Sequence, residues 1–270
     1  MSEHVIIVGK GGVGKTTTAA NLAAALAVTG NKVLRVGHHM PGCWSAARQA
    51  GKPILSRKMQ EGPSAPGCAP GFRNSLYVEA RELGLARKSD LLRHPAISGF
   101  GPDFVIHDLD WQPGTTFELP DATEGVARLV AVTSADMGAI NAVNELFAWL
   151  NTVAAVDCRF GGLVVNNLPG PLHKAIVADY AAQANAAVVA NIPHSLMVSV
   201  SDFCGQPTLE TAPFSNISQT YRKLAGVVLE PNEVRRPGFL KRGALGQWAL
   251  RWGEIIAELE TGVVRDGSNI

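Results

Sequence analysis

The chain has 270 residues, of which 46% are hydrophobic, enough for one large α/β domain with a sizeable core. Its 24 basic and 23 acidic residues leave a formal net charge of +1, which argues against binding to nucleic acid or to an anionic membrane. The sequence has no apolar run near about 18 residues, no signal peptide and no Cys-x-x-Cys pair, so we expect a cytoplasmic protein without a membrane span, a disulfide scaffold or a zinc finger.

The first element is an apolar run at residues 5–8, which leads into Gly-x-x-x-x-Gly-Lys-Thr and an Ala/Leu-rich segment. This order predicts a strand, a phosphate-binding loop and a helix from Thr16 to about Val28. The glycines let backbone N–H groups turn toward phosphate oxygens, and the helix adds the positive end of its dipole. We expect Lys15 to contact the β- and γ-phosphates and the Thr16 hydroxyl to bind Mg²⁺. The candidate nucleotide-binding residues are Gly11, Gly12, Val13, Gly14, Lys15, Thr16 and Thr17.

Downstream of this loop, predicted strands and helices alternate along the chain. The predicted strands are residues 31–36, 103–109, 129–133, 162–166 and 187–192, and the predicted helices are residues 74–85, 136–153, 172–186, 215–229 and 244–260. Residues 37–73 are rich in Gly and Pro, so we expect mainly loops there. The alternation predicts an α/β fold with a single doubly wound, mostly parallel sheet.

We expect a nucleotide-binding domain over residues 1–229 and an extension over residues 230–270. The extension begins with a basic linker rich in Pro and Gly and continues as a predicted helix. The linker charges could face a partner or only solvent.

Asp108 ends the predicted strand 103–109, at the strand end where α/β proteins place ligand-binding groups. In phosphate-loop proteins such an acid holds Mg²⁺, commonly through water, so Asp108 is a candidate metal ligand together with Thr16. The alternative is a solvated aspartate at a strand end. Asp110 follows two residues later, and an exposed loop acid is an equally ordinary interpretation of it.

Lys10 follows the first glycine of the loop directly and marks the deviant Walker A form. Residues 9–36 resemble the nitrogenase iron protein family, which includes the iron proteins of protochlorophyllide and chlorophyllide reductases. Arsenite-pump and septum-site ATPases share the loop more distantly. The resemblance runs from residue 4 to about residue 229.

The resemblance implies a homodimeric, Mg-ATP-dependent ATPase that acts on a partner protein and could pass electrons to it. Lys10 would reach the partner subunit's nucleotide, and Lys10, Lys15 and Asp108 would be the catalytic residues. A cluster-free relative that acts as a nucleotide-dependent switch or assembly factor is the alternative function.

The resemblance also assigns the base-binding end of the site. Asn166 stands where the family has an asparagine whose amide contacts the adenine edge, although an ordinary turn residue is the alternative. Pro193 lies in Ile-Pro-His-Ser, which matches the family's Ile/Val-Pro-x-Asp except that Ser195 replaces the acid. We therefore expect Asn166 and Pro193 to line the adenine pocket.

Residues 37–45 correspond to the family's first switch, but His39 and Cys43 stand where the family has two acids. A thiol is a poor ligand for a hard cation, so we predict slow ATP hydrolysis. A metal site built from His38, His39 and Cys43 is an alternative use of these side chains.

Residues 61–69 resemble the family segment whose cysteine is one of two per subunit that hold a [4Fe–4S] cluster between the subunits. The resemblance implies Cys68 as an iron–sulfur ligand. The second family cysteine has no counterpart, because residues 114–120 keep the Phe and Pro of that pattern but not its cysteine. Two copies of Cys68 supply two thiolates where a cluster normally takes four, so we predict that no stable cluster of the family type forms.

Overall fold

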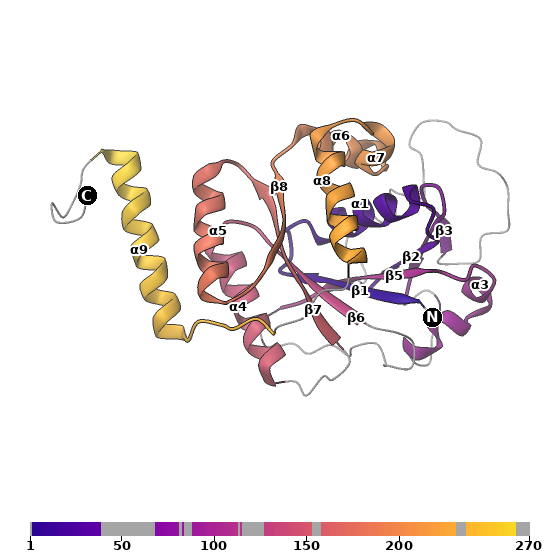
Figure 1. Ribbon diagram of the computed structural model, residues 1–270, viewed down its shortest axis with the longest axis horizontal. Coiled ribbons are helices and arrows are strands. Elements are labelled where there is room, and N and C mark those ends of the chain that lie inside the picture. The colour runs from indigo at the N-terminus through magenta and orange to yellow at the C-terminus, as the bar shows by residue number, and fades with distance from the viewer. Residues whose placement is uncertain are drawn as a thin grey trace.

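The computed structural model describes residues 2–38, 68–80, 83, 88–112, 114, 127–152, 158–230 and 236–262. Its centre is an eight-stranded sheet in the order β3-β4-β2-β5-β1-β6-β7-β8, with helices against both faces (Figure 1). The strands are β1 (Glu3–Gly9), β2 (Val33–Gly37), β3 (Cys68–Pro70), β4 (Ser75–Glu79), β5 (Phe104–Asp110), β6 (Ala127–Thr133), β7 (Cys158–Leu168) and β8 (Val188–Pro193). All neighbouring strands pair in parallel except β3 and β4. The predicted α/β fold with one mostly parallel sheet is confirmed.

The helices are α1 (Lys15–Val28), η1 (Lys88–Arg93), α3 (Pro95–Ser98), α4 (Met137–Thr152), α5 (Pro171–Gln183), α6 (Leu196–Cys204), α7 (Thr208–Thr211), α8 (Asn216–Leu229) and α9 (Arg242–Thr261). One core cluster packs α1 and α8 against one face of the sheet, and a second packs α4, α5 and α9 against the other. The central strand β1 is apolar on both faces because both are covered, and Val5 and Val8 are fully buried in different clusters.

The predicted helix at residues 74–85 is wrong, because residues Ser75–Glu79 form strand β4. Leu76 and Val78 point into a small core cluster on one face of the sheet, whereas Tyr77 and Glu79 point to the other face. That alternation is a strand period, and pairing with β2 extends the sheet beyond the predicted edge. The predicted loop region also contributes β3, which runs antiparallel to β4.

The other predicted elements appear within a few residues of their expected bounds, as β2, β5, β6, β7, β8, α1, α4, α5, α8 and α9. The short helices η1, α3, α6 and α7 were not predicted. Each spans fewer than ten residues, too few for a helical period to show in the sequence.

Helix α9 lies at one end of the molecule beside α5 (Figure 1). The Asp179 carboxylate on α5 accepts hydrogen bonds at Oδ2 from Trp248 Nε1 at 2.7 Å, from Trp252 Nε1 at 2.8 Å and from Arg251 Nη2 at 2.7 Å. Burial opposes the ionised carboxylate, but the indole N–H bonds and the charge of Arg251 outweigh it and lower the pKa of Asp179. This carboxylate therefore attaches the C-terminal helix to the sheet domain.

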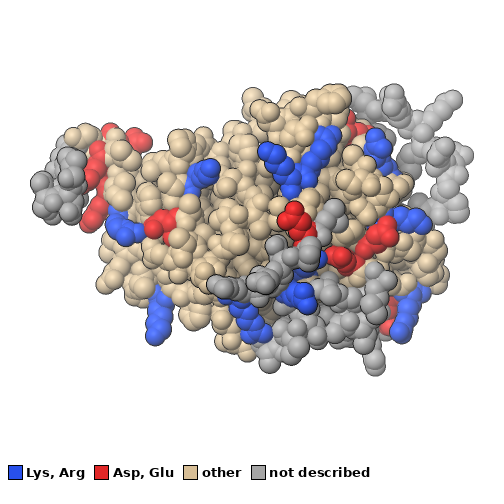
Figure 2. Space-filling view, in the orientation of Figure 1, with Lys and Arg blue, Asp and Glu red and all other residues tan. Residues whose placement is uncertain are grey.

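Among the described residues on the face drawn in Figure 2, basic and acidic side chains are interspersed, with no large patch of one sign. Among the described helices, none combines the length and apolar composition needed to cross a membrane.

Candidate nucleotide-binding site

The loop between β1 and α1 depends on glycines at defined positions. Gly12 and Gly14 have φ angles of 84° and 88°, in the left-handed region that favours glycine. A Cβ atom at Gly14 would also lie 2.1 Å from Nδ2 of Asn166, and one at Gly9 would lie 2.2 Å from the carbonyl oxygen of Val132. The loop therefore keeps its shape only with glycine at these positions.

Lys15 begins α1, and its side chain is 4% exposed. Its ammonium donates to the carbonyl oxygen of Lys10 at 2.9 Å and forms an ion pair with Oδ1 of Asp110 at 2.8 Å. The loop thus holds one buried positive charge against a carboxylate that is 39% exposed. A bound phosphate oxygen is chemically equivalent to that carboxylate as a partner for Lys15.

Asp108 lies on β5, where it pairs with Ile7 of β1 on one side and Gly37 of β2 on the other. Its side chain is 1% exposed. A buried carboxylate beside the strand that leads into the loop suits a ligand for Mg²⁺, together with the Thr16 hydroxyl on the first turn of α1. The sequence pattern singled out Asp108 and left Asp110 as a possible exposed loop acid, whereas the fold pairs Asp110 with Lys15.

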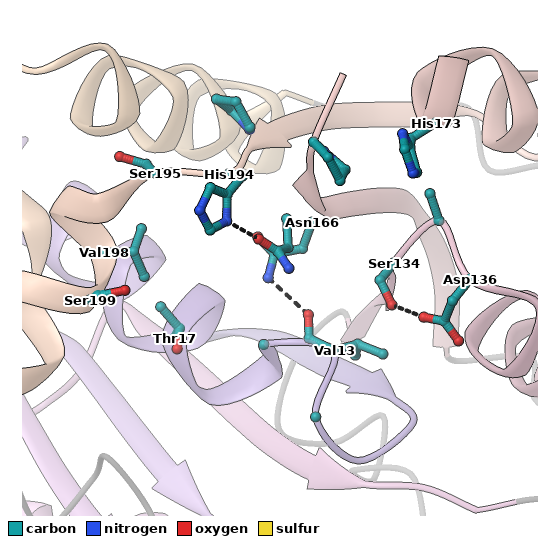
Figure 3. Close-up of a pocket in the computed structure, with 16 residues that line it drawn as sticks. Val13, Thr17, Ser134, Asp136, Asn166, His173, His194, Ser195, Val198 and Ser199 are labelled. Carbon is teal, nitrogen blue, oxygen red and sulfur yellow. Dashed lines mark hydrogen bonds between the residues drawn. The ribbon is translucent and has the colours of Figure 1, made fainter. Parts of the chain in front are cut away.

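A cavity of about 630 Å³ opens beside the loop, a size that suits a nucleotide (Figure 3). Its walls are the loop, the ends of β6 and β7, and the segment from the end of β8 into α6. The lining residues are Gly12, Val13, Gly14, Thr17, Ser134, Ala135, Asp136, Asn166, Asn167, Pro169, His173, Pro193, His194, Ser195, Val198 and Ser199. The structure thus brings Asn166 and Pro193 to the same cavity as the predicted loop residues Gly12, Val13, Gly14 and Thr17.

Asn166 has a structural role that the sequence did not reveal. Its Nδ2 donates to the carbonyl oxygen of Val13 at 2.8 Å, so the amide ties β7 to the phosphate loop (Figure 3). The neighbouring Asn167, with a φ of 56°, places Oδ1 2.7 Å from Nδ1 of His194. Asn167 and His194 were missed, although two asparagines before Pro-Gly and a histidine after Pro193 mark polar turns at this end of the sheet.

Asp136 is another residue that sequence reasoning missed. It accepts from the amide of Ala139 at 2.9 Å, at the start of α4, and from the hydroxyl of Ser134 at 2.5 Å (Figure 3). Burial opposes ionisation, but these hydrogen bonds and the charge of Lys10 lower the pKa of Asp136. A Cβ atom at Gly138 would lie 2.6 Å from Nζ of Lys10, so the exposed Lys10 side chain extends over the start of α4.

Cys68 begins β3, at the outer edge of the sheet, separated from β1 by β4, β2 and β5. Burial raises the pKa of its half-buried thiol, which disfavours the thiolate that binds iron. Within the described residues, no three His, Cys, Asp or Glu side chains form a group that could hold a metal ion. Of the two cysteines per subunit that hold such a cluster in the resembling family, this sequence keeps Cys68, and two copies of Cys68 would supply two of the four thiolates that a [4Fe–4S] cluster normally takes.

Several predicted features lie outside the described residues: His39, Cys43, residues 61–67, and residues 115–120 of the segment compared with the second family cysteine. His38 is described, and its Nε2 lies 3.1 Å from Nδ1 of His107, whose Nε2 in turn lies 3.0 Å from Nδ1 of His4. His38 is thus part of a row of imidazoles that crosses from β1 to the end of β2.

Comparisons with protein families and with known proteins cover most of this chain. The family model of 4Fe-4S iron sulfur cluster binding proteins, NifH/frxC family, matches residues 85–253, and an AAA domain model matches residues 3–52. Nitrogenase iron protein 2 of Paenibacillus durus is 31% identical, over 97% of this chain and 96% of that protein. The chain belongs to the NifH/frxC family. Within this family, the nitrogenase iron protein of Methanospirillum hungatei is 25% identical over 84% of this chain and 88% of that protein.

Solved structures show the fold of this NifH/frxC family member at lower identity. The MinC:MinD cell division protein complex of Aquifex aeolicus has a TM-score of 0.64 at 18% identity, over 88% of this chain and 100% of that chain. The septum site-determining protein MinD of Pyrococcus horikoshii, complexed with Mg-ADP, has a TM-score of 0.60 at 20% identity, over 85% and 97%. The chain therefore has the P-loop ATPase fold, and the resemblance predicted from residues 9–36 is confirmed.

Proposed function

We propose that this chain is a homodimeric ATPase that binds Mg-ATP and couples its binding and slow hydrolysis to action on a partner protein. The observation that carries the proposal is Lys15, a buried ammonium in a glycine-dependent loop beside a cavity of about 630 Å³. Backbone N–H groups of the loop and Lys15 would hold the phosphates. Thr16 and Asp108 would hold Mg²⁺, which supplies charge neutralisation at the phosphates when bound.

The Lys15–Asp110 ion pair suggests how nucleotide binding is transmitted. A phosphate oxygen competes with Asp110 for the same ammonium, so ATP releases the carboxylate at the end of β5. Asp110 lies within residues 108–114, which resemble in sequence the family's second switch, the loop that senses the γ-phosphate. We infer that occupancy of the nucleotide site changes the position of this loop, which a partner protein can sense.

Lys10 supports the homodimer. Its side chain is exposed and reaches over the start of α4 rather than into its own phosphate loop. A lysine in that position is available to a second subunit across a two-fold interface.

ATP binding and hydrolysis could be coupled to one of two actions on the partner protein, electron donation or a cluster-free conformational switch, and different observations favour each. Electron donation through a cluster at Cys68 follows from the family's description as iron–sulfur proteins. A cluster-free nucleotide-dependent switch or assembly factor is favoured by the raised pKa of the Cys68 thiol and by the missing second cysteine. We propose the cluster-free role for this chain.

Titration calorimetry of the wild type and Lys15→Ala with Mg-ATP tests the nucleotide site. We expect the variant to lose a charge-assisted contact worth roughly 1.5–3 kcal/mol, which is a loss of affinity of about 10-fold or more. Lys174→Ala on α5 removes an exposed lysine and serves as the control. An unchanged affinity in Lys15→Ala would overturn the phosphate-loop assignment.

A further inference from the structure

The cavity beside the phosphate loop has two ends that differ in chemistry (Figure 3). Toward β6 its wall includes the carboxylate of Asp136, whereas toward α6 it includes the apolar side chains of Pro193 and Val198. The loop between these ends is the site for phosphates. A nucleobase is flat and uncharged, so it suits an apolar wall with polar groups at its edge. The base of a nucleotide held at the loop therefore fits the end formed by β8 and α6.

The amide nitrogen of Asn166 is held against the phosphate loop. Its Nδ2 donates to the carbonyl oxygen of Val13 at 2.8 Å, and a Cβ atom at Gly14 would lie 2.1 Å from the same nitrogen. An amide that reads the adenine edge uses both its oxygen and its nitrogen, because the edge has a donor at N6 and an acceptor at N1. Asn166 is left with its oxygen, so a second group is needed to read a base here.

An irregularity in β7 directs another side chain to this end of the cavity. The register between β7 and β8 shifts between Val165 and Leu168, and the two asparagines in between have no partner residue in β8. Asn167 has a φ of 56°, a left-handed conformation that few residues other than glycine adopt. Bulges of this kind change the direction of a side chain and are common beside binding sites. In this chain the bulge brings the amide of Asn167 to His194, and both residues line the cavity.

The contact between these two residues fixes which imidazole nitrogen carries the proton. Oδ1 of Asn167 lies 2.7 Å from Nδ1 of His194 and can only accept, so Nδ1 is the donor. A neutral imidazole has one N–H, and Nε2 of His194 is therefore an acceptor. The backbone is held here as well, because the amide of His194 donates to the carbonyl oxygen of Leu168 at 2.9 Å. Ser195 then begins α6 by accepting from the amide of Met197 at 3.3 Å.

We propose that His194 is the specificity-determining residue that selects adenine over guanine and hypoxanthine, and that Asn167 is a positioning residue that acts through it. This inference rests on the proposed binding of Mg-ATP. Adenine has an amino group at position 6 that can donate to Nε2, whereas guanine and hypoxanthine have a carbonyl oxygen there. Two acceptors that face each other share no hydrogen, which weakens binding by about 10- to 100-fold.

His194→Phe tests the proposal, because the phenyl ring keeps the flat shape of the side chain and removes both nitrogens. The probes are Mg-ATP and Mg-ITP, whose base is hypoxanthine, and titration calorimetry at pH 8 keeps the imidazole neutral. We expect the wild type to bind ATP about 10- to 100-fold more tightly than ITP, and His194→Phe to bind both within about threefold of each other. His94→Phe changes a half-buried histidine outside the cavity lining and is the matched control, which should keep the wild-type ratio.

Asn167→Gly is the second variant, because glycine keeps the left-handed backbone and removes only the acceptor for Nδ1. Without that acceptor the imidazole can carry its proton on Nε2 and donate to the carbonyl oxygen of ITP, so the preference for ATP should fall at least several-fold. If His194 only stabilised the turn into α6, its loss would lower both affinities equally and leave the ratio unchanged.

An unchanged ratio in His194→Phe, or equal affinities of the wild type for ATP and ITP, would overturn the role of His194 while leaving the proposed nucleotide site intact. A wild-type protein that binds neither nucleotide would overturn both.

Discussion

Asp110→Asn tests two consequences of the Lys15–Asp110 ion pair. The pair should stabilise the nucleotide-free protein, and it should compete with ATP for Lys15. The ammonium and carboxylate are 2.8 Å apart, with Lys15 4% and Asp110 39% exposed. A hydrogen bond between charged groups contributes roughly 1.5–3 kcal/mol, and solvent at the exposed carboxylate reduces this to about 1 kcal/mol. The variant leaves a buried ammonium without its carboxylate, so the free energy of unfolding of the nucleotide-free protein should fall by about 1 kcal/mol.

The same substitution should strengthen nucleotide binding. Because ATP no longer has to displace a carboxylate from Lys15, the gain of about 1 kcal/mol corresponds to roughly fivefold tighter binding. Titration calorimetry measures the affinity, and thermal unfolding with and without Mg-ATP measures the stability. Asp90→Asn in η1, which packs against α3, is the control. Weaker ATP binding in Asp110→Asn would refute the competition between carboxylate and phosphate.

Three other expected outcomes concern the dimer, the cysteine and the C-terminal helix. The wild type should sediment as a dimer with Mg-ATP, and Lys10→Ala should weaken that dimer; a wild-type monomer at micromolar concentration with ATP contradicts this. Cys68→Ser should leave folding and ATP affinity unchanged. If the reconstituted wild-type dimer contained four irons and the Cys68→Ser dimer did not, the electron-donor role would be restored. Asp179→Ala should lower the free energy of unfolding by about 1–2 kcal/mol through its lost bonds to Trp248, Trp252 and Arg251. Because the folded-state pKa of Asp179 lies below its ordinary 3.8, this contribution is present above pH 3.8 and disappears as the pH falls through the folded-state pKa. The unfolding midpoints of the wild type and of Asp179→Ala should therefore approach each other in acid. Midpoints that stay equally far apart in acid would contradict this role of Asp179.

Local patterns in the sequence were enough for the phosphate loop and for the fold class. The run of apolar residues before Gly9, the glycine spacing and Lys15 are each required by the backbone path or by the charge of a phosphate, so they can be recognised without knowing what surrounds them. The long helices α4, α8 and α9 were also predictable, because burying one face against a sheet imposes a helical period over many residues. Helix α1 was predicted instead from its Ala/Leu-rich composition directly after the phosphate loop, and residues 21–27 of it are all buried.

Contacts between residues far apart in the chain decided the rest. The segment at residues 75–79 became a strand because β2 offered an edge and both faces could be buried, and this brought Glu79 beside Gly37 and Asp108. The assignment of Asp110 to Lys15, and of the Asn166 amide to Val13, depends on distances across strands that no spacing in the sequence encodes. Sequence determined the chemistry that the loop requires, and the tertiary structure decided which charged and polar side chains meet it, because parallel pairing brings the ends of distant strands to one edge of the sheet.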